Sequence, residues 1–113
     1  MTEEQLQALL DKFCAAALRM TELKIREIIL FGSYARGDAD EESDVDIMIL
    51  TDIPAEEIPE YRYQLARLSS ELSLEFGPVV SALLKNYDSF THWQGVLPFY
   101  QNVRREGVCL HAA

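Results

Sequence analysis

Two short apolar runs, Ile25 to Phe31 and Val45 to Leu50, constrain the fold of this chain more than any other feature. Both runs are rich in β-branched residues and are followed by polar turn residues, which is typical of buried strands. A third run, Val79 to Leu84, has Ser81 as its only polar residue. We therefore expect three strands, the third of them central or half-buried in its sheet.

Amphipathic segments alternate with these runs. Apolar residues recur at intervals of three and four from about residue 3 to 20 and from Ile58 to Leu72, which predicts two helices with one buried face each. We also expect a short helical turn from Tyr34, a helix from Pro98 to Gly107, and an optional short strand at Val108 to Leu110. The predicted order, α-β-α-β-α-β-α, indicates an α+β fold in which helices pack on a small mixed sheet.

Composition limits the kinds of protein that this chain can be. Its 113 residues are 49% hydrophobic and 26% charged, which predicts one domain, residues 1–113, around a single core. The formal charge of −9 argues against binding to duplex nucleic acid. No apolar run is long enough for a membrane span and the first residues are acidic, so we expect a cytoplasmic protein without membrane contact. Cys14 and Cys109 are expected to be buried thiols, outside any disulfide or zinc site.

Six carboxylates lie close together between Asp38 and Asp46, and two of them stand apart from the others. Asp38 to Glu42 is most simply a solvated acidic turn. Asp44 and Asp46 frame the start of the second strand, where side chains two residues apart project to one face, about 6 Å from each other. Their charges would repel by roughly 2 to 3 kcal/mol. A hard cation such as Mg²⁺ or Mn²⁺, bound through carboxylate oxygens, would relieve this repulsion.

A phosphate-binding turn is expected at Gly32 and Ser33, directly after the first strand. Glycine allows close approach of the backbone, and the serine hydroxyl and free N–H groups of a helical turn can hold phosphate oxygens. Turn formation alone also explains a Gly-Ser pair. The spacing of this pair, ten residues before Asp44-Val45-Asp46, is what indicates a shared site. Arg36 could contact phosphate, or it could pair with an adjacent carboxylate.

This pattern resembles the signature of the nucleotidyltransferase superfamily with the polymerase-beta-like fold, in which Gly-Ser precedes Asp-x-Asp by some ten residues. The segment GSYARGDADEESDVD, Gly32 to Asp46, matches it without a gap, and Ala-Arg-Gly after the serine is usual in small bacterial members. The chain is similar above all to minimal nucleotidyltransferases, the single-domain antitoxins that act beside HEPN-domain ribonuclease toxins. The tail LPFYQNVRREGVCL resembles their terminal helix and strand. The similarity covers about residues 25 to 110.

The resemblance implies a function and a set of site residues. It implies that Asp44 and Asp46 are catalytic and hold Mg²⁺ (or Mn²⁺), and that Gly32 and Ser33 bind the nucleotide, with Arg36 as a secondary candidate. It further implies transfer of AMP from ATP, or another nucleoside triphosphate, to a hydroxyl group. For the antitoxins the acceptor is a tyrosine of the HEPN toxin, so we expect a hetero-oligomer.

One departure from the family's pattern leaves alternatives open. Fully active members carry a third carboxylate on the third strand, but the expected position, near Val79 to Ser81, holds neither Asp nor Glu. Glu75 is the nearest acid, and it is either a displaced substitute or a solvated residue at a helix end. A one-metal transferase, a site completed by a partner, and a nucleotide-binding module that neutralises its partner by forming a complex all fit the sequence. A sensor of phosphate metabolites without a protein partner is a further possibility.

Overall fold

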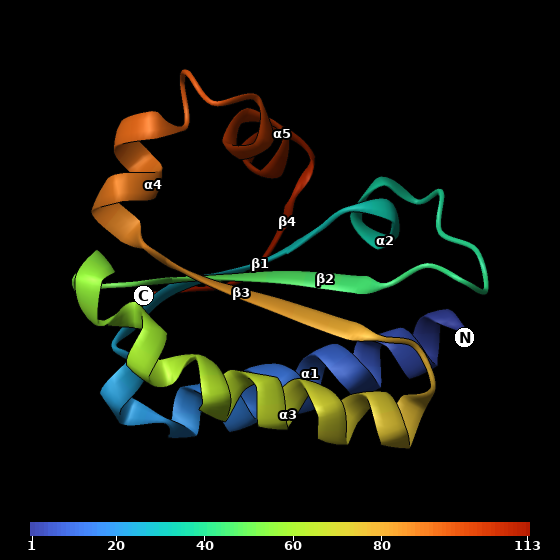
Figure 1. Cartoon of the computed structure of the whole chain (residues 1–113). Helices are drawn as coiled ribbons and strands as arrows, with labels where there is room; N and C mark the ends of the chain where they lie inside the picture. Colours follow the sequence, from blue (N-terminus) through green and yellow to red (C-terminus); the bar gives the residue numbers. More distant parts are fainter.

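The computed structural model describes residues 1–113 and places a four-stranded mixed sheet between two layers of helices (Figure 1). In chain order the elements are α1 (Glu3–Arg19), the 3-10 helix η1 (Thr21–Leu23), β1 (Ile25–Phe31), α2 (Ser33–Arg36), β2 (Val45–Thr51), the 3-10 helix η2 (Ala55–Tyr61), α3 (Arg62–Phe76), β3 (Val80–Asn86), α4 (Tyr87–Trp93), α5 (Pro98–Glu106) and β4 (Val108–Ala112). The predicted α+β class with a small mixed sheet is confirmed.

The sheet has the strand order β3-β2-β1-β4. β1 pairs antiparallel with both β2 and β4, whereas β2 and β3 are parallel and are joined through α3. Parallel neighbouring strands need a long crossover connection, and the segment between Thr51 and Val80 is long enough to provide one. Asp46 on β2 is the register partner of Phe31 on β1 and of Ser81 on β3. β3 is half-buried as expected, but it lies at the edge of the sheet and not at its centre.

The two faces of the sheet are covered unequally. α1 and α3 pack on one face around a core of 17 buried residues, which we call the α1/α3 face. α4 and α5 pack on the other, the α4/α5 face, around a cluster of only five buried residues: Ile29, Met48, Leu50, Phe90 and Val103. Alternate residues of β2 divide between these two clusters, as the period of a strand requires. Asp46 therefore points to the thinner, α4/α5 side.

Three local features differ from the expectations. The helix expected around Ile58 to Leu72 begins as the 3-10 helix η2, because Pro59 lacks an N–H and restricts the residue before it, and α-helical structure begins only at Arg62. The terminal strand forms as β4 and extends to Ala112. Cys14 is half-buried, but Cys109 is exposed on that strand, so the prediction of two buried thiols is wrong for Cys109. None of the helices combines the length and the apolar character that a membrane span requires.

Candidate functional site

The end of β1 and the start of β2 bring Gly32 against Asp46. Gly32 has φ +76° and ψ −157°, a conformation that favours glycine. A Cβ atom added to Gly32 would lie 2.4 Å from Oδ2 of Asp46. The Asp46 carboxylate therefore rests directly on the Gly32 backbone, and glycine is needed both for the turn and for this close approach.

Asp44 and Asp46 form an acidic pair at the start of β2. β2 begins at Val45, so Asp44 lies just before the strand, exposed, while Asp46 is half-buried within it. Burial raises the pKa of the Asp46 carboxyl above its usual range, and the charge of Asp44 raises it further, whereas the charge of Arg36 lowers it. The charge of Asp44 thus acts on the Asp46 carboxyl, although Asp44 precedes the strand on which both were expected to share a face.

Arg36 occupies the end of α2, the single helical turn that follows Gly32. The Gly32 carbonyl accepts hydrogen bonds from the N–H groups of Ala35 and Arg36, each at 3.1 Å. The Arg36 guanidinium forms ion pairs with Asp38 at 3.2 Å and with Glu106 of α5 at 3.5 Å. The hydrogen bond with Asp38 is the main reason why the pKa of Arg36 is raised. The intradomain pairing considered for Arg36 is thus present, with a second partner from the far end of the chain.

One face of α5 closes this corner into a pocket of about 310 Å³. Four residues of α5 at helical spacing i, i+3, i+4 and i+7 face the turn after β1. The pocket is lined by Phe31, Gly32, Ser33, Arg36, Asp46, Phe99, Asn102, Val103 and Glu106. The Phe99 ring meets the Phe31 ring edge-on, with their centroids 5.6 Å apart.

The α5 wall of the pocket was not predicted from the sequence. The periodicity of Pro98 to Gly107 indicated a helix but not the part of the sheet on which it packs. Phe99, Asn102 and Glu106 are therefore site residues that only the three-dimensional structure reveals. Four of the five residues predicted for the site, Gly32, Ser33, Arg36 and Asp46, line the pocket, whereas exposed Asp44 lies outside its lining and acts on Asp46 through its charge.

β3 supplies no third carboxylate to this site, and the other acidic residue of the pocket, Glu106, is ion-paired with Arg36. Ser81 is the β3 residue in register with Asp46, and no group of three or more His, Cys, Asp or Glu side chains in the chain is arranged to hold a metal ion. Glu75 lies at the end of α3 on the opposite side of the sheet, where it is exposed and ion-paired with Lys12. Glu75 is thus a solvated residue at a helix end and does not belong to the site.

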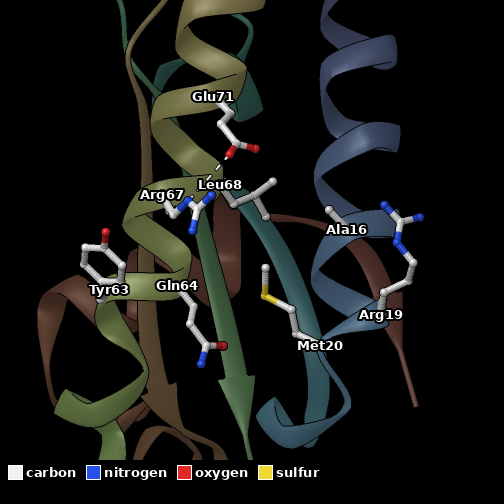
Figure 2. Close-up of a pocket in the computed structure, with 8 residues that line it drawn as sticks. All are labelled: Ala16, Arg19, Met20, Tyr63, Gln64, Arg67, Leu68 and Glu71. Carbon is white, nitrogen blue, oxygen red and sulfur yellow. Dashed lines mark ion pairs between the residues drawn. The ribbon is translucent and has the colours of Figure 1, made fainter.

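A larger hollow, of about 470 Å³, lies between α1 and α3 (Figure 2). Leu68 and Met20 project into the space between the two helices, and Arg67 pairs along α3 with Glu71 at 3.8 Å. This hollow contains no paired carboxylates and no backbone turn. Its chemistry is that of a shallow seam between two packed helices, so size alone does not identify the functional site.

The raised pKa of Asp46 predicts a specific pH dependence of cation binding. Protons compete with cations for Asp46, so the affinity of any cation that binds there should fall as the pH drops through a range above that of an ordinary aspartate. Because the raised pKa means that the folded state holds the proton more tightly, ionisation of Asp46 costs stability as the pH rises through its pKa. Titration of the Asp46 carboxyl by carbon NMR should show this pKa, and Asp44→Asn should lower it. An unchanged pKa in that variant would contradict the coupling of the two carboxylates.

Comparisons with known proteins are consistent with this geometry. The family model described as "nucleotidyltransferase domain" matches residues 10–105. A protein of Methanocaldococcus jannaschii that carries the provisional name protein adenylyltransferase is 38% identical over 91 residues, which is 78% of this chain and 80% of the relative. A toxin-antitoxin crystal structure with AMP-PNP covers 100% of this chain and 75% of its own, with a TM-score of 0.57 and 22% identity. A structure of the tri-AMPylated Shewanella oneidensis HEPN toxin in complex with MNT antitoxin covers 95% of this chain and 72% of its own, with a TM-score of 0.55 and 22% identity.

Proposed function

The chain belongs to the nucleotidyltransferase domain family, and from this premise we propose that it transfers AMP from ATP to a hydroxyl group of a partner protein in a cation-dependent reaction. The observation that carries the proposal is the placement of Asp46. Its carboxylate rests against the Gly32 turn, interacts with Asp44, and lines a pocket walled by Ser33 and Arg36. Paired acids beside a glycine turn can bind a cation and a phosphate chain at the same place.

The residues present fit a divalent cation with oxygen ligands. Asp44 and Asp46 would hold it, because burial and mutual repulsion make their joint ionisation unfavourable without a positive charge nearby. Mg²⁺, or Mn²⁺, accepts one or two carboxylates together with phosphate oxygens and water, which suits a site in which β2 offers two carboxylates and Glu106 is paired with Arg36. Such a cation neutralises charge on the phosphate oxygens when it is bound.

The remaining roles fall to the turn and to Arg36. Gly32 and the Ser33 hydroxyl would hold the terminal phosphates so that the acceptor oxygen lies in line with the bond that breaks. The acceptor oxygen bonds to the α-phosphorus, and the bond from that phosphorus to the bridging oxygen breaks to release pyrophosphate. Arg36 would exchange part of its ion pairing with Asp38 and Glu106 for phosphate oxygens. The hydroxyl proton of the acceptor cannot pass to a carboxylate on β3, because the β3 residue in register with Asp46 is Ser81.

The partner that we propose is a HEPN-domain toxin, with a tyrosine as the acceptor and this chain as the antitoxin. Support comes from the two complexes above, whose descriptions name a toxin-antitoxin pair with AMP-PNP and an AMPylated HEPN toxin bound to its antitoxin. A complex with such a partner would be a hetero-oligomer.

The proposal predicts that Asp44→Asn with Asp46→Asn reduces transfer at least about 100-fold, because the cation loses both charged ligands. The purified chain and its co-expressed partner are incubated with Mg²⁺ and ATP labelled at the α-phosphate, and label on the partner is counted. Glu41→Gln with Glu42→Gln is the matched control, since it removes the same charge from the adjacent acidic turn. Equal labelling by the wild type and the Asp44/Asp46 variant would reject this site.

A second candidate function is favoured by Ser81 in place of a third carboxylate. In this alternative the chain binds nucleotide with little turnover and neutralises its partner by forming a complex. The same double variant distinguishes the two functions in cells that express the toxin. Protection from toxicity should be lost if transfer is required, and it should persist if complex formation is sufficient.

A further inference from the structure

The edge of the sheet formed by β3 has no neighbouring strand on its outer side (Figure 1). The Val45 N–H donates to the Val79 carbonyl at 2.8 Å, so the backbone groups of alternate residues from Val79 onward face β2. Those of Ala82 and Leu84 consequently face outward. The Val80 N–H also faces outward, but it donates to the Ser73 hydroxyl at 2.9 Å. This N–H is therefore not available to an added strand. An unpaired strand edge of this kind can template the addition of another strand.

A continuous groove follows this open edge. Two hollows, of about 430 and 210 Å³, adjoin each other and share Arg62, Leu84 and Lys85. The larger hollow lies between β3 and the α3 surface, and the smaller one continues past Asn86 toward Ser89 on α4. The groove therefore offers room beside the strand edge along nearly the whole length of β3.

The charge of the groove is opposite to that of the molecule. The chain has 19 acidic and 10 basic residues, yet neither hollow is lined by any Asp or Glu, and both contain Arg62 and Lys85. None of the ion pairs in the chain involves these two cations. These groups are suited to a ligand that brings negative charge and hydrogen-bond acceptors.

We propose that the β3 groove binds an extended acidic peptide segment of a partner protein, which adds a strand to the outer edge of β3. Backbone hydrogen bonds to Ala82 and Leu84 would give affinity, and Arg62 and Lys85 would select carboxylate side chains. A second copy of this chain is disfavoured, because its β3 edge carries the same two cations and no acidic residue to pair with them. A nucleic acid is disfavoured by the net charge of −9.

The groove also has a defined position relative to the candidate site. It begins at Val80 and Ala82, on either side of Ser81, which is the register partner of Asp46. A segment docked on β3 would therefore run parallel or antiparallel to the strand that carries Asp46, with β3 between them. Delivery of an acceptor hydroxyl by such a segment rests on the proposed function, whereas the binding itself does not.

The test uses the full chain labelled with nitrogen-15 and two soluble capped peptides of alternating residues, Glu-Val repeats and Lys-Val repeats. We expect saturable binding of the Glu-Val peptide, at least about tenfold tighter than that of the Lys-Val peptide, with the largest amide shifts at Ala82 and Leu84. Arg62→Gln with Lys85→Gln should weaken binding about tenfold. Arg67→Gln is the control, because it removes a cation of α3 that lies outside the groove and pairs with Glu71.

Two further binding measurements test the pairing of the peptide with the β3 edge and its independence from the candidate site. A Glu-Val peptide that carries N-methyl groups on alternate amides should bind no better than the Lys-Val peptide, because it cannot pair with the strand edge. The Asp46→Asn variant should bind the Glu-Val peptide as the wild type does, so failure of the transferase proposal leaves this test intact. The inference is overturned if the Glu-Val peptide does not saturate, if its shifts map away from β3, or if Arg67→Gln weakens binding as much as the groove variant.

Discussion

Gly32→Ala is expected to destabilise the fold by about 1–3 kcal/mol and to reduce nucleotidyl transfer at least about 100-fold. Two effects combine at this position. The positive φ of Gly32 strains any other residue, and the new Cβ would lie 2.4 Å from Oδ2 and 3.3 Å from Cγ of Asp46. The Asp46 carboxylate must rotate away, so the charged group closest to the turn would leave its place in the pocket.

The Gly37→Ala variant separates the effect of backbone strain from the effect of a clash with Asp46. Gly37 ends α2 with φ +84°, but a Cβ added there meets nothing within 4 Å. We expect a comparable loss of stability, about 1 kcal/mol, with transfer and Mg²⁺ binding close to those of the wild type. Stability is measured by denaturant unfolding and activity by labelling of the partner. If Gly37→Ala lost as much activity as Gly32→Ala, backbone strain alone would be responsible and the contact with Asp46 would be irrelevant.

Local sequence signals predicted most of the strands and helices. The apolar run Ile25 to Phe31 is β1 to the residue, because polar or turn-forming residues bound it at both ends. The three- and four-residue spacing of Ile58, Tyr61, Leu65, Leu68 and Leu72 marked one helix face, on which four residues are buried and Tyr61 is half-buried. The spacing from Ser33 to Asp44 likewise brought the Gly32 turn and Asp46 together, since a short loop must return the chain to a neighbouring strand. These features depend on contacts between residues close in sequence.

What sequence could not predict depends on contacts between distant segments. The edge position of β3 is set by which strands pair, and an apolar run of this kind is compatible with either a central or an edge place. The ion pair of Arg36 with Glu106 joins residues from α2 and α5, and no local pattern relates them. The wall formed by Phe99 and Asn102 has the same origin. Half of the pocket thus became visible only when α5 was placed over the α4/α5 face of the sheet.

The small cluster on that face leads to the second large prediction, for Phe90→Ala. Phe90 is fully buried, and it is one of only five buried residues that hold α4 and α5 to the sheet. Its ring packs 4.7 Å from that of Tyr100, and the Arg104 guanidinium lies 5.1 Å above it. Truncation should cost about 3–5 kcal/mol, a large part of the total stability of a domain of this size. Because α5 forms one wall of the pocket, ATP affinity should fall as well.

Leu9→Ala is the matched control on the opposite face. Leu9 is equally buried but belongs to the 17-residue cluster under α1 and α3, so its truncation should cost about 2–5 kcal/mol without altering the pocket. Unfolding in denaturant measures both losses, and ATP binding is compared at low temperature, where circular dichroism verifies that each variant is folded. Phe90→Leu, a milder change of about 1–1.5 kcal/mol, reports on the pocket if Phe90→Ala does not fold. Equal ATP affinity in the folded Phe90 and Leu9 variants would mean that the packing of α5 does not shape the pocket beside Gly32.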